Sequence, residues 1–239
     1  MAYPGAYWIK RLSGGNRNQE GDLMNITIRH EQPDDRRTAE EVTREAFWNL
    51  YCPGASEHYL VHTLRKHPDF IPELSFVIEL DGRLVGSIYY TRAKVIKENG
   101  DAVDVVSFGP VSIHPDLHRK GLGRALITHS IQAAKDSGSG AIVIGGFRYH
   151  YEPYGFVGTK KYGIAMPDGK YYTGIMALPL FEGALDDAKG QVHFSAALYP
   201  DMSGFDAYDA TFPEKEKRVL PCQEEFARAS TEIDIRTSF

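Results

Sequence analysis

The sequence predicts an α/β protein in which helices flank a mixed sheet. Three strand-like runs follow one another between residues 74 and 113 and are joined by tight turns, which predicts hairpin neighbours. An amphipathic helix is expected next, at about 121–137. The short apolar run at 141–144 is typical of a strand buried on both faces. The expected element order is β-α-α-β-β-β-α-β-α-β-β.

The first strand and two helices are expected in residues 25–64. Residues 25–30 alternate apolar and polar side chains, as a half-buried strand does. Pro33 and the acidic residues behind it suit the first turn of a helix, and Pro53-Gly54 is expected to end that helix. A second helix is expected from Ser56. Apolar residues recur at helical spacing at Val42, Ala46, Phe47 and Leu50 in the first helix, and at Tyr59, Leu60 and Leu64 in the second.

Three strands are expected in the middle of the chain, at 74–80, 84–96 and 103–113. Asp81-Gly82 is a strong hairpin signal between the first two, and a second turn is expected at 98–101. The third run contains Gly109-Pro110. Because proline cannot donate to a strand ladder, we expect a bulge there rather than regular pairing.

The last expected elements are a short helix at 149–154 and strands near 156–165 and 171–180. Residues 183–239 are less periodic, and the sequence contains no internal repeat. We therefore expect one domain at 24–182 and a C-terminal extension at 183–239 that packs on it. Met24 is followed at once by a strand-like run, so residues 1–23 are expected to be an upstream extension or an expression remnant, disordered and outside the fold.

Composition and charge exclude several classes of protein. The formal net charge is −5 and the sequence pI is about 6.0, which is not the footprint of a nucleic-acid-binding protein. No apolar run reaches the roughly 18 residues of a membrane span, so no membrane partner is expected. Cys52 and Cys222 form no C-x-x-C pair and are expected to be reduced thiols in a cytoplasmic protein.

The loop before the helix at 121–137 has the features of an anion site. A strand ends at Ile113, a proline loop follows, and Gly121 and Gly123 open the helix. Unpaired N–H groups at a helix N-terminus attract phosphate, and glycine lets the backbone approach it. The P-loop and dinucleotide fingerprints are both absent. Two glycines before a helix are equally compatible with a tight turn, so the loop alone does not identify a ligand.

The segment from Val111 to Gly123 resembles the acetyl-CoA motif of the GNAT acetyltransferase superfamily. That motif is an apolar strand end followed by P-x-x-[QR]-x-x-G-x-[GA], and His118 stands where Gln or Arg is usual. Residues 151–156 are similar to the family's Y-x-x-x-G-F. The wider sequence, with Phe108-Gly109-Pro110-Val111, is similar to a bacterial group of predicted N-acetyltransferases with a C-terminal extension.

The resemblance implies a mostly antiparallel sheet whose fourth and fifth strands splay apart around acetyl-CoA. It implies that the cofactor lies on Val111, Ser112, Ile113, His118, Arg119, Lys120, Gly121, Leu122, Gly123 and Arg124. It also implies direct attack by an amine on the thioester, with Tyr151 as the general acid. No metal is expected. Ser107, Asp104, Glu57 and His58 are candidates for a general base, and none of them can be assigned.

Alternatives to an N-acetyltransferase remain open. His58 and His62 stand four residues apart on one helix face, the spacing of some zinc sites, but no third ligand accompanies them. A non-catalytic acyl-CoA sensor or interaction module on the same fold is a second alternative. The acceptor is expected to be a small-molecule amine, a peptide N-terminus or a lysine. Residues 183–239 leave a homodimer interface open.

Overall fold

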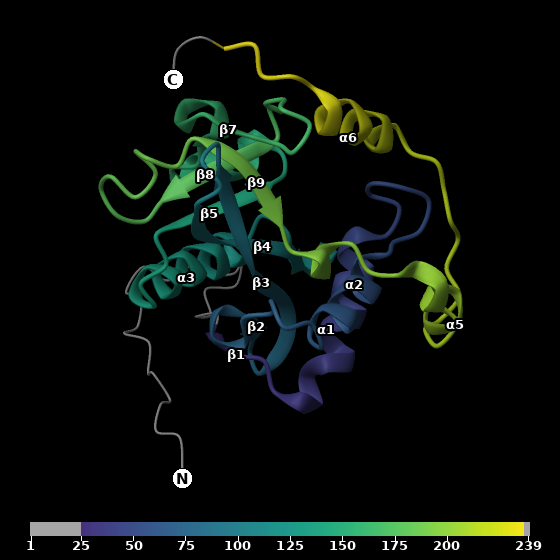
Figure 1. The fold of residues 1–239 in the computed structure, drawn as a ribbon. Coiled ribbons are helices and arrows are strands. Elements are labelled where there is room, and N and C mark those ends of the chain that lie inside the picture. Colours follow the sequence, from purple (N-terminus) through teal and green to yellow (C-terminus); the bar gives the residue numbers. More distant parts are fainter. Residues whose placement is uncertain (1–24, 237–239) are drawn as a thin grey trace.

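A nine-stranded mixed sheet forms the centre of the molecule in a computed structural model that describes residues 25–236 (Figure 1). The expectation for residues 1–23 lies outside the described residues. The strands are β1 (Ile26–His30), β2 (Phe76–Leu80), β3 (Arg83–Lys97), β4 (Ala102–Ile113), β5 (Ala141–Gly145), β6 (Val157–Gly158), β7 (Ile164–Ala165), β8 (Ile175–Pro179) and β9 (Gly190–Phe194). The helices are α1 (Arg36–Phe47), α2 (Glu57–Leu64), α3 (Leu122–Asp136), α4 (Arg148–Tyr151), α5 (Phe205–Asp209) and α6 (Pro221–Thr231).

The strand order is β1-β2-β3-β4-β5-β8-β6, and most neighbours are antiparallel. The described parallel pairs are β4 with β5 and β7 with β9. The register between β4 and β5 consists of one pair, Val106↔Ile142, so the two strands diverge beyond it. The expected mixed, mostly antiparallel sheet with a splay between its fourth and fifth strands is confirmed.

The bulge expected at Gly109-Pro110 is also confirmed. Ile88 pairs with Val111 and Tyr90 pairs with Phe108, so two residues of β4 stand opposite one residue of β3. The Gly109–Pro110 peptide bond is cis. A bulge bends its strand and increases the local twist. It lies in the part of β4 that runs beyond the pairing with β5.

The two faces of the sheet carry different helices. Successive residues of a strand point to opposite faces. Val77 packs with Ala39 and Val42 of α1, and its neighbour Ile78 packs with Leu126 of α3. Figure 1 shows the result: α3 covers one face, and α1 and α2 cover the other.

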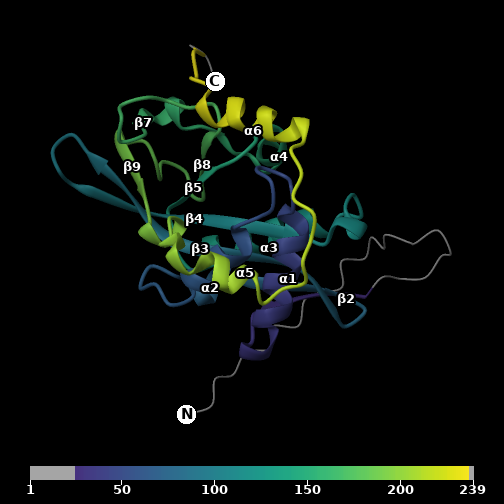
Figure 2. The ribbon, with the colours of Figure 1, turned by 90° about the vertical axis from the view of Figure 1, so that its right-hand side faces the viewer.

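Residues 183–236 contribute to the sheet and wrap around it. β9 pairs with β3 over Ala93–Lys97, beyond the part of β3 that pairs with β2. The chain then runs through α5 beside α2 and climbs along the side of the molecule to α6 (Figure 2). β9 was not expected from the sequence, because its alternating run is only four residues long, Gln191 to Phe194, and lies in a region that is otherwise not periodic.

Three local expectations are wrong. The first helix ends at Phe47, so Leu50 lies in a turn and is exposed rather than on the helix's inner face. The run at 156–165 is not one strand, because a 3₁₀ turn at Thr159–Tyr162 separates β6 from β7. The run at 171–180 forms a strand only from Ile175. None of the helices in residues 25–236 has the length and apolar character needed to cross a membrane.

Candidate active site

The loop between β4 and α3 exposes the start of a helix. Gly121 caps α3 with a φ of 84°, a left-handed conformation that favours glycine. The first bond of the helix ladder runs from the Ala125 N–H to the Gly121 carbonyl at 2.9 Å. The N–H groups of residues 122–124 therefore precede the ladder, and Gly121 has no side chain to cap them. This arrangement suits an anion.

The same loop carries positive charge. Arg119, Lys120 and Arg124 are exposed along it, and Arg119 has a φ of 62°. A left-handed non-glycine residue is strained, and such strain is concentrated at functional sites. At Gly123 a Cβ would approach only Ile113 Cγ1, at 3.6 Å, so this side of the helix start is open. A phosphate can therefore reach both the backbone and the cations.

The end of β4 presents a free backbone edge beside this loop. The His114 N–H donates to the Val85 carbonyl at 2.8 Å, and the Cα register pairs Ser112 with Ser87. Hydrogen bonding alternates along an antiparallel strand, so the backbone groups of Val111 and Ile113 point away from β3. They face the gap that opens where β5 diverges. An extended ligand can pair there as a strand would.

His118 already uses part of that edge. Its Nε2 donates to the Ile113 carbonyl at 2.9 Å, which ties the loop to the strand end. A ligand that needs this carbonyl has to displace the imidazole. His118, which stands where Gln or Arg is usual in the motif, therefore has a structural role in the loop.

Ser112 is turned away from the gap. Its hydroxyl lies 3.0 Å from the Ser87 hydroxyl and 3.2 Å from the Thr43 hydroxyl of α1. All three side chains are buried on the α1 face. The Ser112 side chain is therefore held by other residues of the fold and does not face the gap.

Tyr151 lies on the far side of the gap, at the end of α4. Its ring contacts Phe108 of β4 and Phe156, with centroid distances of 5.7 Å and 5.9 Å. Its hydroxyl has no hydrogen-bond partner among residues 25–236. Burial raises the pKa of Tyr151, and the nearby phenols of Tyr51 and Tyr154 add to the rise. The phenol is therefore protonated at neutral pH.

The loop and the tyrosine approach each other. Burial raises the pKa of Tyr154, and the Arg124 guanidinium of α3 opposes that rise, so the two side chains are within electrostatic reach. Val111, Ile113 and Tyr151 also pack against one hydrophobic cluster that contains Leu122. The two motifs that the sequence places about thirty residues apart thus border the same gap.

Gly146 positions Tyr151 and was not singled out from the sequence. A Cβ at Gly146 would lie 2.6 Å from Tyr151 Cε2, so a larger residue would displace the ring. The signal that could have revealed it is Gly145-Gly146 directly after the buried run 141–144, because glycine pairs after a strand often mark a close approach.

The candidates for a general base lie in different environments. Asp104 is exposed and lies 3.8 Å from Lys94 Nζ, at the end of β4 away from the splay. Ser107 is buried. Glu57 is half-buried at the first position of α2, and its Oε2 accepts from the Ser56 N–H at 3.0 Å.

His58 is fully buried under α5. Its Nε2 lies 3.0 Å from Asp209 Oδ1, but the two atoms are not aligned as a hydrogen bond, and Nδ1 has no partner within the described chain. Burial lowers the pKa of His58 to about 4, against the opposing effect of Asp209. The ring is a neutral packing residue at pH 7. His62 lies 3.3 Å from Glu40 Oε1 instead, so the two histidines do not converge on one point. Residues 25–236 contain no group of three or more His, Cys, Asp or Glu side chains placed to hold a metal.

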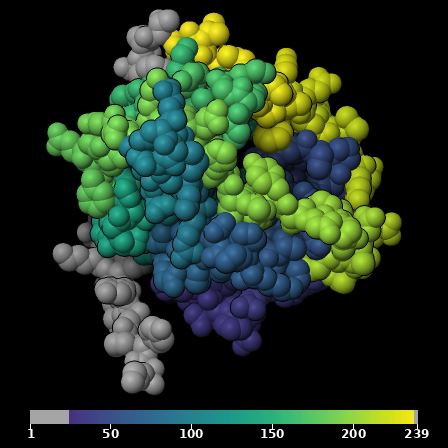
Figure 3. All heavy atoms as spheres, in the orientation of Figure 1, coloured from purple at the N-terminus to yellow at the C-terminus, as the bar shows by residue number. Residues whose placement is uncertain are grey.

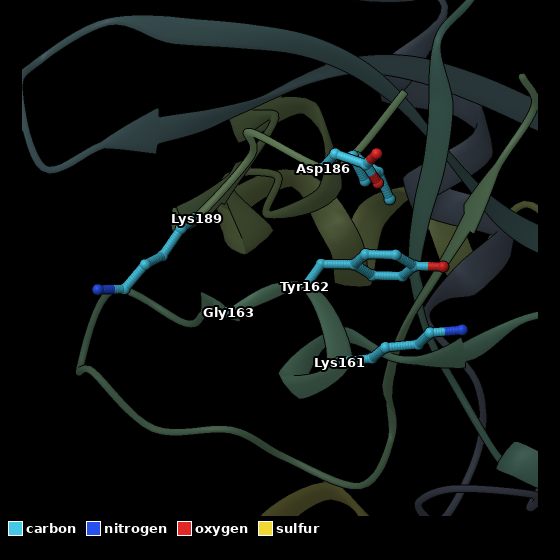
Figure 4. A pocket seen from close by; sticks show the side chains of 6 residues that line it. Lys161, Tyr162, Gly163, Asp186 and Lys189 are labelled. Atoms are coloured by element: carbon cyan, nitrogen blue, oxygen red, sulfur yellow. The ribbon is translucent and has the colours of Figure 1, made fainter. Parts of the chain in front are cut away.

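A separate hollow of about 460 Å³ lies between the turn after β6 and the segment before β9 (Figure 4). Lys161, Tyr162, Asp186 and Lys189 line it, and Lys189 is paired with Glu98 at 3.0 Å. None of its lining residues belongs to the β4–α3 loop or to α4. The hollow and the gap between β4 and β5 are therefore separate features of the molecule.

The gap combines a helix N-terminus, an open strand edge and a protonated tyrosine, an arrangement that suits an extended anionic ligand. Comparison with protein families gives one match. Residues 44–149 match the family model described as Acetyltransferase (GNAT) family. This match includes the β4–α3 loop and ends before Tyr151. Residues 44–149 are therefore similar to the GNAT acetyltransferase family.

Solved structures share the fold. The GNAT family N-acetyltransferase YhbS from Escherichia coli, in complex with CoA, is 21% identical with a TM-score of 0.66, over 75% of this chain and 94% of that chain. A GNAT family acetyltransferase from Brucella melitensis, in complex with acetyl-CoA, is 24% identical with a TM-score of 0.57, over 72% of this chain and 97% of that chain. Comparison with curated proteins gives no match.

Proposed function

We propose that this protein transfers the acetyl group of acetyl-CoA to a primary amine by direct attack. The observation that carries the proposal is the continuity of the exposed α3 N-terminus with the free edge of β4. A helix N-terminus can hold the pyrophosphate of CoA. The free edge of β4 can pair with the pantetheine arm that follows the pyrophosphate. The CoA and acetyl-CoA complexes of the two solved neighbours support this ligand.

The residues present fit such a ligand. The N–H groups of residues 122–124 and the guanidinium groups of Arg119 and Arg124 would hold the pyrophosphate. The backbone of Val111 would pair with the pantetheine arm, and that of Ile113 would do so after His118 turns aside. The thioester would then lie toward Tyr151.

Tyr151 would donate its hydroxyl proton toward the departing sulfur. A thiol has an ordinary pKa of about 8.5, and burial places the phenol's pKa above its usual range of about 10. Complete transfer to a solvated thiolate is therefore uphill. The same dry surroundings also make a neighbouring thiolate more basic, so a hydrogen bond from Tyr151 gains strength as charge grows on sulfur.

Ligand binding tests the proposal directly. A ligand that binds only the native state stabilises it by about 2.7 kcal/mol at 100 times its dissociation constant. We expect acetyl-CoA to raise the melting temperature, with little effect from ATP and none from NADH. Release of free CoA thiol in the presence of a panel of amines and peptide N-termini then measures turnover. A shift with NADH and none with acetyl-CoA would overturn the proposal. Binding without turnover on any acceptor would favour the acyl-CoA sensor instead.

A further inference from the structure

The loop that carries His118 folds back onto the end of β4. After Ile113, a 3₁₀ turn spans Pro115–Leu117, and the His118 N–H donates to the Pro115 carbonyl at 3.1 Å. Leu117 is half-buried and packs against the hydrophobic cluster that contains Leu122. The turn is therefore anchored at Leu117, and the next residue, His118, returns to the strand end that lies five positions earlier in the chain.

The imidazole of His118 occupies a backbone acceptor that the pairing with β3 does not use. Ser112 and His114 pair with β3, so the Ile113 carbonyl between them points to the gap. His118 Nε2 donates to this carbonyl at 2.9 Å. An extended ligand that pairs with β4 would donate an amide N–H to the same oxygen. The ring lies on the edge along which that ligand would run, so the imidazole and the ligand compete.

Two features make this contact displaceable. The His118 side chain is exposed, so water can replace both partners of the hydrogen bond, and the net gain from the bond is modest. The next residue, Arg119, has a left-handed φ of 62°, which is unfavourable for a residue with a side chain and offsets part of that gain. The contact therefore forms in the protein without ligand and is weak enough for a ligand to replace it.

The His118 contact is local and does not involve the segments that close another side of the molecule. In Figure 3 the light green and yellow C-terminal segment lies against the blue atoms of α2 and of the loop 48–56. The hydrogen bonds of His118 described above join it to its own loop and to the end of β4. A change of the His118 side chain therefore leaves the contacts of the C-terminal segment in place.

We propose that His118 is an internal competitor of the pantetheine arm at the Ile113 carbonyl and weakens the binding of acetyl-CoA and CoA alike. The inference rests on the proposed function and concerns the regulation of the same site. A ligand that binds only the open form of a site has an apparent affinity reduced by the fraction of molecules in that form. Acetyl-CoA and CoA carry the same pantetheine arm, so the imidazole lowers both affinities by one factor. It thereby limits inhibition by the product CoA.

The strength of one hydrogen bond sets the size of the expected effect. A neutral hydrogen bond of ordinary strength shifts an equilibrium about 2- to 10-fold. The closed form, in which His118 holds the Ile113 carbonyl, is therefore favoured over the open form by about this factor. Acetyl-CoA and CoA then bind the minority form, and removal of the imidazole makes the whole population competent to bind.

Calorimetric titration of the full-length protein with matched probes isolates this contact without requiring turnover. CoA carries the pantetheine arm, whereas adenosine 3′,5′-bisphosphate carries the nucleotide end of CoA without that arm. His118→Ala should tighten the binding of acetyl-CoA and of CoA by the same factor, about 2- to 10-fold. The affinity for adenosine 3′,5′-bisphosphate should change little. The preference for CoA over the bisphosphate should therefore rise in the variant.

Two further variants separate the hydrogen bond from a general effect on the loop. His118→Gln keeps an N–H donor on a side chain of similar length, so it should raise the preference for CoA less than His118→Ala does. His114→Ala is the matched control, because it removes another imidazole of the same loop, whose Nδ1 accepts from the Asp116 N–H at 3.4 Å. It should leave the preference unchanged. A general loss of loop structure would weaken the binding of both probes instead.

The inference is overturned when His118→Ala prefers CoA over the bisphosphate no more than the wild type does, or when His118→Gln raises the preference as much as His118→Ala. A failure of the proposed function gives a different result, because the wild type then binds neither acetyl-CoA nor CoA, and the inference fails with it. Binding of both ligands by the wild type, with an unchanged preference in His118→Ala, would leave the proposed function standing and remove the inference.

Discussion

The two sides of the candidate site are built in different ways. The side proposed for CoA is formed by consecutive residues, 118–124, together with the end of one strand, and it offers mainly backbone groups at the surface. The side around Tyr151 joins residues from the loop 48–56, from the start of α4 and from α6, which are about 75 to 175 positions apart and meet through side-chain contacts. A backbone site needs only a local conformation. A side-chain site needs the packing of the whole molecule.

The largest expected effect is the loss of activity on substitution of Tyr151, which lies between the two sides. Tyr151→Phe removes one hydroxyl and keeps the ring contacts with Phe108 and Phe156. Because the hydroxyl acts mainly in the transition state, we expect kcat to fall by about 10²- to 10⁴-fold. The KM for acetyl-CoA should stay within a few-fold. Single-turnover rates measure the chemical step directly.

Tyr154→Phe is the matched control, since Tyr154 ends the next turn of the same segment and packs against the same hydrophobic cluster, but has no proposed role in proton transfer. It should change the single-turnover rate little. A wild-type rate for Tyr151→Phe would show that this tyrosine only packs, and that water protonates the thiolate.

The next effect concerns the ion pair that joins α1 to α5. Arg44 of α1 donates to Asp209 of α5 at 2.8 Å, and the Arg44 side chain is 4% exposed. Asp209→Ala leaves this buried charge without its carboxylate, so we expect a loss of about 3 kcal/mol in the free energy of unfolding. Urea unfolding measures it.

Asp187→Ala is the control for that variant, because Asp187 pairs with Lys97 at 2.5 Å but is 97% exposed. It should leave the free energy of unfolding unchanged. Under conditions where Asp209→Ala remains folded, its affinity for acetyl-CoA should equal that of the wild type. Loss of that affinity would mean that the two sides are not built independently.

The same packing predicts a loss of stability in mild acid. The pKa of His58 is lowered from its ordinary 6.5 to about 4, so the unfolded chain takes up a proton below pH 6.5 that the folded chain does not take up until about pH 4. Stability is therefore lost as the pH falls through this window. We expect about 2 kcal/mol between roughly pH 7.5 and roughly pH 5.

Asp209, Arg44 and Glu40 also act on His58, so the contribution of the imidazole has to be isolated by substitution. His58→Gln removes the titrating group. Its free energy of unfolding should depend less on pH over this window than that of the wild type, as measured by urea unfolding at both values. Parallel pH dependences would assign the acid sensitivity to other groups.

The smallest effect tests whether the CoA side depends on one backbone conformation. Gly121→Val forces a β-branched residue into a left-handed conformation, which costs about 1–2 kcal/mol. Relaxation of that strain would move the helix start, so we expect the affinity for acetyl-CoA to fall about 10-fold. Gly169→Val is the control, because Gly169 has a φ of 79° with open space around it in another turn. Equal acetyl-CoA affinity in both variants would place the pyrophosphate elsewhere.

Much of the fold follows from local sequence signals. The hairpin at Asp81-Gly82, the bulge at Gly109-Pro110 and α3 behind Gly121 were all predicted, because each depends on a preference of a few adjacent residues. The β4–α3 loop was predicted for the same reason. Its anion-binding character comes from the backbone at a helix start, and the glycines that permit it are visible in the sequence.

The remaining features depended on contacts between distant segments. β9 is a short alternating run that the sequence alone does not assign to any partner, and it pairs with the part of β3 that extends beyond β2. The sequence left Ser112 and Val111 equivalent as cofactor residues, and only the packing of α1 turned the Ser112 hydroxyl toward Thr43. His58 and His62 share a helix face, yet α5 and α1 give them separate partners.

By itself, then, the sequence determined the hairpins, the bulge and the loop that suits a phosphate, since short-range backbone preferences encode them, while Tyr151 was indicated by the resemblance to a family motif. Only the tertiary structure brought Phe226 onto Tyr51 and turned the Ser112 hydroxyl toward Thr43. The physical reason is that burial and pairing are properties of the surroundings of a side chain. Here those surroundings are supplied by residues that are far away in the sequence.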